Sequence, residues 1–241
     1  MNSAHDTEPD RRQRTLGLLL LVIAAPSIGA LSALWLWPGP VGSTIYSVCK
    51  AILYVIPAIV AWCTLTRADV WEGVRRGSRA APILFGILSG VLIGGGIIAL
   101  WFTVLAERTD TSKLMAVIEE SGMDDPLKYW AFGAWLCIGN SLLEEFVFRW
   151  FVDSRLRVLR MVPLFALPLS AAIFTAHHII VLGAFFQWPL IILGSAGVFT
   201  GGLIWSWSLR RWQSLIPGWI SHAIVDVAIF IVGASMLGFL G

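Results

Sequence analysis

Seven ionisable side chains form three groups inside long apolar segments of this sequence. The groups are Glu144 and Glu145 with Arg149, His177 with His178, and His222 with Asp226. An ionisable group in such a segment is costly unless it is paired or hydrated, so each one is a functional candidate. Carboxylates and imidazoles can act as general bases on water. The chemistry that these residue types favour is hydrolysis in a partly dehydrated site.

The spacing within each group determines which side chains can meet on a helix. Glu145 and Arg149 are four residues apart, so the arginine can neutralise that carboxylate. Glu144 then points about 100° away and stays available as a base. His222 and Asp226 are also four apart and share a helix face. Ion pairs that only fix helix register, and proton-coupled transport, are alternatives for the same residue types.

The composition places these residues in a membrane. Hydrophobic residues make up 57% of the 241 residues and charged residues 13%, against about 25% charged in soluble domains. The mean hydropathy is +0.79. A net charge of +2, with no basic run interleaved with aromatics, argues against a nucleic-acid partner. Cys49, Cys63 and Cys137 are odd in number and lie in apolar segments, which argues against disulfides or a cysteine metal site.

Seven segments are long and apolar enough to cross a lipid bilayer as helices. They are residues 16–37, 43–65, 81–104, 127–151, 162–184, 187–208 and 215–240. The predicted fold class is all-α, a polytopic transmembrane helix bundle with about seven spans. We expect residues 1–14 to form a disordered cytoplasmic tail and residues 15–241 to form one transmembrane domain. Gly86, Gly90 and Gly94 give the third span a smooth face against which another helix can pack.

The distribution of basic residues predicts how the spans are oriented. Arginines concentrate before the first span, between the second and third, after the fourth and after the sixth, and these ends share one side of a seven-span bundle. They are Arg11, Arg12, Arg14, Arg67, Arg75, Arg76, Arg79, Arg155, Arg157, Arg160, Arg210 and Arg211. The longest loop of the other side, residues 105–126, is acidic. Because basic loops stay inside, we expect a multi-pass protein of the plasma (inner) membrane with a cytoplasmic N-terminus.

Lys50 is a further ionisable residue within a predicted span. It lies about seven residues from the outer end of the second span, and its long stem could carry the ammonium group to the membrane interface. A structural or interfacial role is therefore the expected one.

Three motifs in order carry a resemblance to a known family. Glu144 to Arg149 read EExxxR, Phe174 to His178 read FxxxH, and His222 to Asp226 read HxxxD. In this order, over residues 127–230, they resemble the CAAX-protease and bacteriocin-processing family of intramembrane endopeptidases. The resemblance implies cleavage of a peptide bond in a prenylated CAAX-type protein, a leader peptide or another membrane protein.

The resemblance also implies a role for each matching position. Glu144 would activate the attacking water with help from His178, and Glu145 and Arg149 would organise the site. His222 and position 226 would stabilise the oxyanion of the tetrahedral intermediate.

Asp226 departs from the pattern of the prenyl-protein endopeptidases, which have asparagine at this position. An ionised aspartate cannot donate a hydrogen bond, so Asp226 would be protonated, orient His222 or bind a cation. Glu144, His178, His222 and Asp226 could then supply ligands to zinc. No HExxH motif occurs in the sequence, and the resemblance implies a mechanism without an obligatory metal. We therefore expect no cofactor, with a zinc-dependent peptidase as the alternative.

Two geometric questions remain open at the level of sequence. His177 points about 100° away from His178 and could replace it if the fifth span is irregular. With the spans as drawn, His178 lies nearer the outer end than Glu144 and His222 do, so the three cannot meet. We attribute this conflict to the boundary of the fifth span or to bending at Pro163 and Pro168.

Other functional classes have weaker support in the sequence. Residues 194–197 read Gly-Ser-Ala-Gly, which puts serine in the wrong place for a GxSG nucleophile, and the GxGD motif of aspartyl intramembrane peptidases is absent. A non-catalytic immunity or transport protein is the rival from another class. An immunity factor that only binds would need none of these ionisable residues, and a transporter would show inverted repeats.

Overall fold

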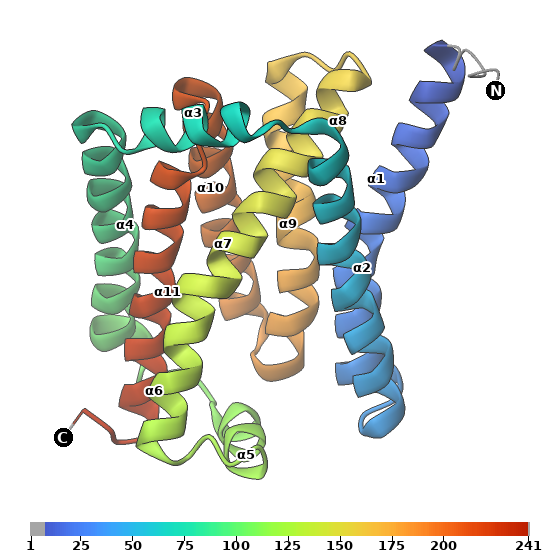
Figure 1. Ribbon diagram of the computed structural model, residues 1–241. Helices are drawn as coiled ribbons and strands as arrows, with labels where there is room; N and C mark the ends of the chain where they lie inside the picture. The colour runs from blue at the N-terminus through green and yellow to red at the C-terminus, as the bar shows by residue number, and fades with distance from the viewer. Residues whose placement is uncertain (1–7, 241) are drawn as a thin grey trace.

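The computed structural model describes residues 8–240, and this part of the chain is entirely helical. Seven helices are long and apolar enough to cross a membrane, which confirms the predicted fold class. They are α1 (Glu8–Leu31, continued by η1, Ser32–Leu36), α2 (Pro40–Thr64), α4 (Ala80–Leu100, continued by η2, Trp101–Leu105), the continuous helix from α6 to α8, α9 (Pro163–Phe185), α10 (Trp188–Trp212) and α11 (Ile216–Met236). The protein is therefore a multi-pass membrane protein. Two shorter helices, α3 (Arg67–Gly77) and α5 (Ser112–Glu120), lie at opposite ends of the bundle (Figure 1).

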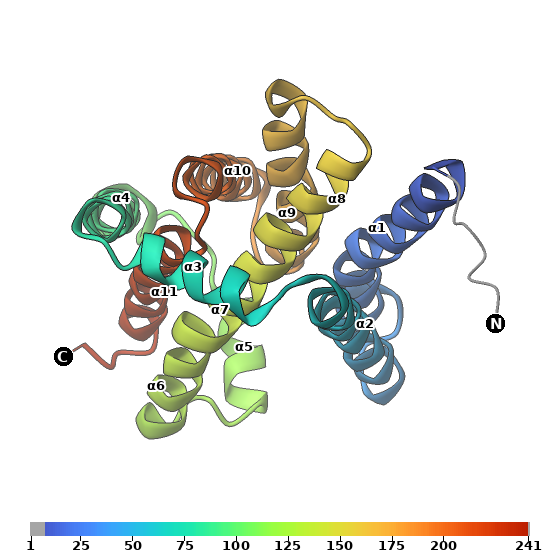
Figure 2. The ribbon, with the colours of Figure 1, turned by 45° about the horizontal axis from the view of Figure 1, so that its top comes forward.

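The helix that carries the EExxxR motif is the longest and runs obliquely through the middle of the bundle (Figures 1 and 2). It consists of α6 (Pro126–Trp135), η3 (Leu136–Asn140), α7 (Ser141–Glu144), η4 (Glu145–Phe151) and α8 (Val152–Val158). The segments η3 and η4 are π-helical, a wider winding that is frequent at functional sites. The motif therefore lies where the backbone departs from regular α-helix.

Proline marks the start of several helices. Pro40, Pro163, Pro189 and Pro217 each occupy the first or second position, where the missing N–H group would have no partner within the helix. Residues 159–162 connect α8 to α9, and residues 213–215 connect α10 to α11. Each of these short connections contains one residue with a left-handed backbone conformation. The tight connections hold consecutive spans antiparallel.

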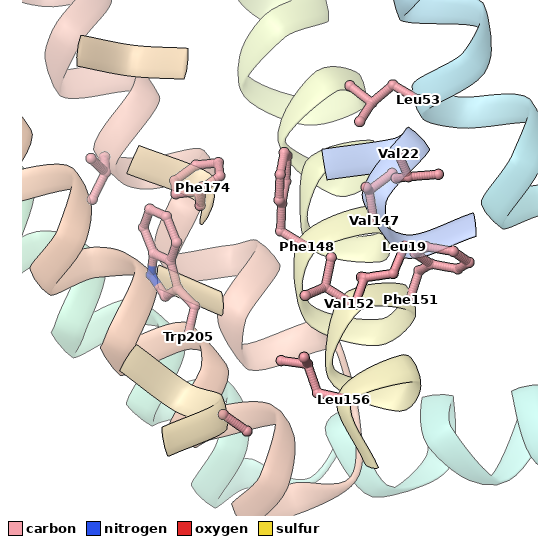
Figure 3. Close-up of a cluster of buried hydrophobic side chains, with 12 residues drawn as sticks. Leu19, Val22, Leu53, Val147, Phe148, Phe151, Val152, Leu156, Phe174 and Trp205 are labelled. Carbon is pink, nitrogen blue, oxygen red and sulfur yellow. The ribbon is translucent and has the colours of Figure 1, made fainter. Parts of the chain in front are cut away.

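A buried apolar cluster joins six of the seven spans (Figure 3). Phe148, Phe151 and Val152 from the central helix are fully buried and pack against α1, α2, α9 and α10. Their partners include Leu19, Val22, Leu53, Phe174 and Trp205. The cluster fixes the central helix immediately beside the EExxxR motif, because Val147 and Phe148 belong to both.

Helices α4 and α11 pack closely through the predicted glycine face. A Cβ atom at Gly90 would lie 2.9 Å from the Cβ of Ile224 and 3.0 Å from the Cα of Ser221. The Ser89 hydroxyl also hydrogen-bonds the Ser221 hydroxyl at 3.0 Å. The packing role predicted for Gly86, Gly90 and Gly94 is confirmed, and it supports α11 from the side away from the central helix.

Helix α1 begins inside the segment for which the sequence predicts a tail. Residues 1–7 lie outside the described residues, whereas Glu8 already opens α1. Glu8 and Asp10 place negative charge at the helix N-terminus, which favours a helical start. Glu8 also pairs with Arg160 in the connection between α8 and α9.

Candidate active site

Glu145, Arg149 and His222 form a buried ionic group between the central helix and α11. The Arg149 Nη2 lies 3.4 Å from the Glu145 Oε1, one helical turn away. The same oxygen lies 3.1 Å from the His222 Nδ1, which is in position to donate to it. Arg149 and Glu145 are 0% and 1% exposed, so each charge depends on the other for compensation. This pairing is the one that the spacing of the EExxxR motif predicts.

The guanidinium group of Arg149 is held mainly by aromatic rings. Its Cζ lies 4.4 Å from the centre of the Phe174 ring and 5.3 Å from that of Trp205. None of its nitrogens has a hydrogen bond in the described part of the chain. Cation–π contact with two rings and the ion pair to Glu145 therefore replace hydration. The phenylalanine of the FxxxH motif thus supports Arg149, a contact that spacing does not reveal.

Gly218 gives Glu145 the space that it occupies. A Cβ atom at this position of α11 would lie 2.8 Å from the Glu145 Oε2. Because the obstacle is the buried carboxylate itself, a larger residue would push Glu145 away from both Arg149 and His222. Gly218 is a site-building residue that sequence reasoning missed.

His222 stands between three carboxylates. Its Nδ1 faces Glu145, while its Nε2 lies 3.8 Å from the Glu144 Oε2 and 3.7 Å from the Asp226 Oδ1. The Trp205 ring stacks on the imidazole with centres 4.1 Å apart and an angle of 15°. The stacked ring and the Glu145 contact fix the imidazole plane, so Nε2 faces the space between Glu144 and Asp226.

Glu144 lines a cavity of about 220 Å³ bounded by α1, α2, the central helix and α9. One of its oxygens, Oε1, accepts a hydrogen bond of 2.9 Å from the Asn140 Nδ2. The other, Oε2, is the oxygen that approaches His222. Glu144 is 8% exposed, which leaves its carboxylate nearly dehydrated at the cavity wall.

His178 and His177 both line the same cavity. The His178 Nδ1 lies 2.9 Å from the carbonyl oxygen of Phe174. Because a carbonyl only accepts, this nitrogen carries the proton and Nε2 of the neutral ring is left as an acceptor. The His177 Nδ1 is buried without a hydrogen-bond partner among the described residues, and its ring stacks on Phe148. The anchored tautomer favours His178 as the histidine that acts beside Glu144.

The depth conflict between His178 and Glu144 has its origin in the fourth span, not the fifth. The fifth span runs over Pro163–Phe185, within one residue of the prediction, so attributing the conflict to its boundary is wrong. The fourth span instead continues to Val158, 14 residues beyond Glu144, and His178 lies 15 residues after Pro163. The two side chains therefore lie at the same depth below the connection between α8 and α9.

Lys50, for which the sequence predicts a structural or interfacial role, lines the cavity and is half-buried. Its Nζ donates to the Tyr54 hydroxyl at 3.1 Å and approaches the Asn140 Oδ1 at 3.5 Å. The Tyr54 hydroxyl donates to the same oxygen at 3.0 Å. Sequence reasoning missed Asn140 and Tyr54. The spacing of four between Asn140 and Glu144, and between Lys50 and Tyr54, was the available signal.

Ion-pair contacts join five of the six residues singled out by the motifs, and the sixth, His178, lines the same cavity as Glu144. In residues 8–240 no three histidine, cysteine, aspartate or glutamate side chains are arranged to hold a metal ion. The carbonyl contact of the His178 Nδ1 leaves Nε2 free, and histidines that bind metals make the same contact, so this bond does not argue against zinc. The side-chain arrangement of the described residues therefore gives the zinc alternative its only test, and it offers that alternative no support.

Comparison with known families identifies the region around this site. A family model described as Type II CAAX prenyl endopeptidase Rce1-like matches residues 126–228. The match begins at the start of α6 and ends within α11, so it spans the central helix, α9, α10 and the histidine of α11. No curated protein matches the chain. No solved structure matches it either.

Proposed function

We propose that Glu144 activates the attacking water in this protein. Residues 126–228 are a domain of the Rce1-like type II CAAX prenyl endopeptidase family, so the chain is an intramembrane peptide hydrolase. The observation that carries this proposal is the position of Glu144. Its carboxylate lines the cavity, with one oxygen fixed by Asn140 and the other facing His222. Glu145, by contrast, is occupied by Arg149 and His222.

In the proposed reaction Glu144 takes a proton from water, and the resulting hydroxide adds to the carbonyl carbon of the scissile peptide bond. The His178 Nε2 accepts a hydrogen bond from the second O–H group of that water and so orients it. When the carbon–nitrogen bond breaks, Glu144 returns its proton to the leaving amine nitrogen. The hydroxyl group gained by the acyl product and the hydrogen gained by the amine product both come from this water.

His222 stabilises the oxyanion through Nε2–H in this proposal. A doubly protonated ring donates Nδ1–H to Glu145 and Nε2–H to the intermediate. Asp226, 3.7 Å from Nε2, favours that protonated ring electrostatically. Of the roles considered for Asp226, orienting His222 and stabilising its positive charge is the one that this distance supports.

The proposed substrate is a peptide segment of a membrane-associated protein, either prenylated and CAAX-type or a leader peptide. We expect purified protein to cleave at least one member of a panel of prenylated, leader and membrane-spanning peptides, detected by mass spectrometry of the products. Cleavage should persist with a chelator, because the proposed mechanism uses Glu144 and no three ligand-type side chains in residues 8–240 are arranged to hold a metal ion. Loss of cleavage on chelation, restored by zinc, would replace the glutamate mechanism with a metal-dependent one. Failure on every peptide would favour a non-catalytic binding or transport role.

We also propose that the α3 end of the bundle faces the cytoplasm, in the plasma (inner) membrane. Arginines gather at that end, whereas the α5 end carries an acidic connection (Figure 1). With Cys49, Cys63 and Cys137 replaced by alanine, we compare Ser78→Cys near α3 with Ser121→Cys near α5; both positions are exposed. In intact cells a membrane-impermeant maleimide should label only Ser121→Cys. Labelling of Ser78→Cys alone would reverse the orientation.

A further inference from the structure

A hydrogen-bond chain connects α2 to Glu144. The Tyr54 hydroxyl and the Lys50 ammonium group both approach the Asn140 Oδ1, at 3.0 and 3.5 Å. The Asn140 Nδ2 then donates to the Glu144 Oε1 at 2.9 Å. Two donors on the amide oxygen determine the orientation of the amide group, because only its nitrogen can then face the carboxylate. The chain is polar along its whole length and ends on the oxygen of Glu144 that does not face His222.

The charge of Lys50 is not explained by an ion pair within the described part of the bundle. The side chain is half-buried and lines the cavity, but it makes no ion pair with a carboxylate in the described part of the chain. An ammonium group that is partly buried without a paired carboxylate lowers the stability of the bundle. A lysine at this position is therefore expected to serve the function of the site. Tyr46 and Tyr54 place their rings 5.7 and 5.3 Å from the Nζ, which partly offsets the loss of stability.

The backbone places Asn140 where this chain needs it. Asn140 is the last residue of the π-helical segment η3, and Glu144 follows one turn later at the end of α7. A carboxylate on a flexible side chain can sample several rotamers, and a general base must be held within hydrogen-bond reach of its water. Fixing Oε1 restricts the carboxylate and leaves Oε2 for that water.

We propose that Lys50, Tyr54 and Asn140 are positioning residues, which hold the Glu144 carboxylate in the orientation that activates water. This inference rests on the proposed function and deepens it. It assigns to α2, which lies outside the matched residues 126–228, a part in catalysis at the site. Tyr46 and Lys50 from α2 and His177 and His178 from α9 line the same cavity as Glu144. His222 from α11 lies 3.8 Å from the Glu144 Oε2.

The test compares matched variants by steady-state kinetics on a peptide that the wild type cleaves. Tyr54→Phe, Lys50→Met and Asn140→Leu should each lower kcat by roughly 10- to 100-fold, with KM little changed. This is the range found when the hydrogen-bond partner that orients a metal ligand is removed, and we expect the same for a partner that orients a general base. Lys50→Arg, which keeps a donor and the charge, should recover most of the lost kcat. Tyr46→Phe is the matched control, because the Tyr46 hydroxyl has no hydrogen bond among the described residues; it should retain wild-type kcat.

The outcomes separate this inference from the proposed function. Full kcat in Tyr54→Phe, Lys50→Met and Asn140→Leu, alongside an inactive Glu144→Gln, would overturn the positioning role and leave the base assignment intact. An equal loss in Tyr46→Phe and Tyr54→Phe would also overturn it. A merely structural role predicts parallel losses of thermal stability and kcat without recovery by Lys50→Arg, so melting temperatures in detergent are measured for every variant.

Discussion

Glu144→Gln should lower kcat by about 100- to 10,000-fold, the range that a positioned general base contributes. Glutamine has nearly the same shape and can still accept the hydrogen bond from Asn140, but its amide cannot take a proton from water. The exchange also removes a charge from an almost fully buried position, so the melting temperature should stay close to that of the wild type. The measurement is kcat and KM on a cleaved peptide, with the melting temperature in detergent.

Glu145→Gln provides the comparison for that result, because it changes the neighbouring carboxylate in the same way. Its charge balances Arg149, so its removal should lower the melting temperature as well as activity. Wild-type activity in Glu144→Gln would show that the base is assigned to the wrong residue. If Glu144→Gln instead unfolded while Glu145→Gln stayed stable, the two carboxylates would have exchanged roles.

Arg149→Ala should destabilise the bundle by about 3–5 kcal/mol, the usual cost of removing one partner of a buried ion pair. The variant leaves the Glu145 carboxylate buried and unbalanced, and it empties the space between Phe174 and Trp205. Because Glu145 also holds the His222 Nδ1, activity should fall together with stability. Unfolding by denaturant in detergent micelles measures the first effect, and peptide cleavage the second.

Arg211→Ala is the control for Arg149→Ala, since it removes an exposed arginine that lies over the ring of Trp212. Its stability should stay close to that of the wild type. A double variant, Arg149→Met with Glu145→Gln, removes both charges and should recover part of the lost stability without recovering activity. Equal stability of Arg149→Ala and Arg211→Ala would contradict the structural importance of the Glu145–Arg149 pair.

The spans and the motif residues could be predicted because their signals are local. Hydrophobic runs of span length require helices in lipid, and a spacing of four places Glu145 against Arg149 whatever the rest of the bundle does. The ends of the central helix were less accessible. The sequence predicts a fourth span that ends at residue 151, before Arg155, Arg157 and Arg160, yet the helix continues to Val158. Asp153 is buried there because it pairs with Arg157 and Arg210.

By itself, the sequence determined that this protein is a helical membrane bundle and which polar side chains its apolar segments carry, since backbone hydrogen bonding in lipid and helical periodicity depend on neighbours in the chain. Only the tertiary structure decided which of those side chains meet. The contacts of Glu144 with Asn140 and of Asn140 with Tyr54, the place of Lys50 in the cavity, and the space that Gly218 leaves for Glu145 depend on how far α2, the central helix and α11 are displaced along one another. That displacement follows from packing between side chains far apart in the sequence, where no short-range spacing records it.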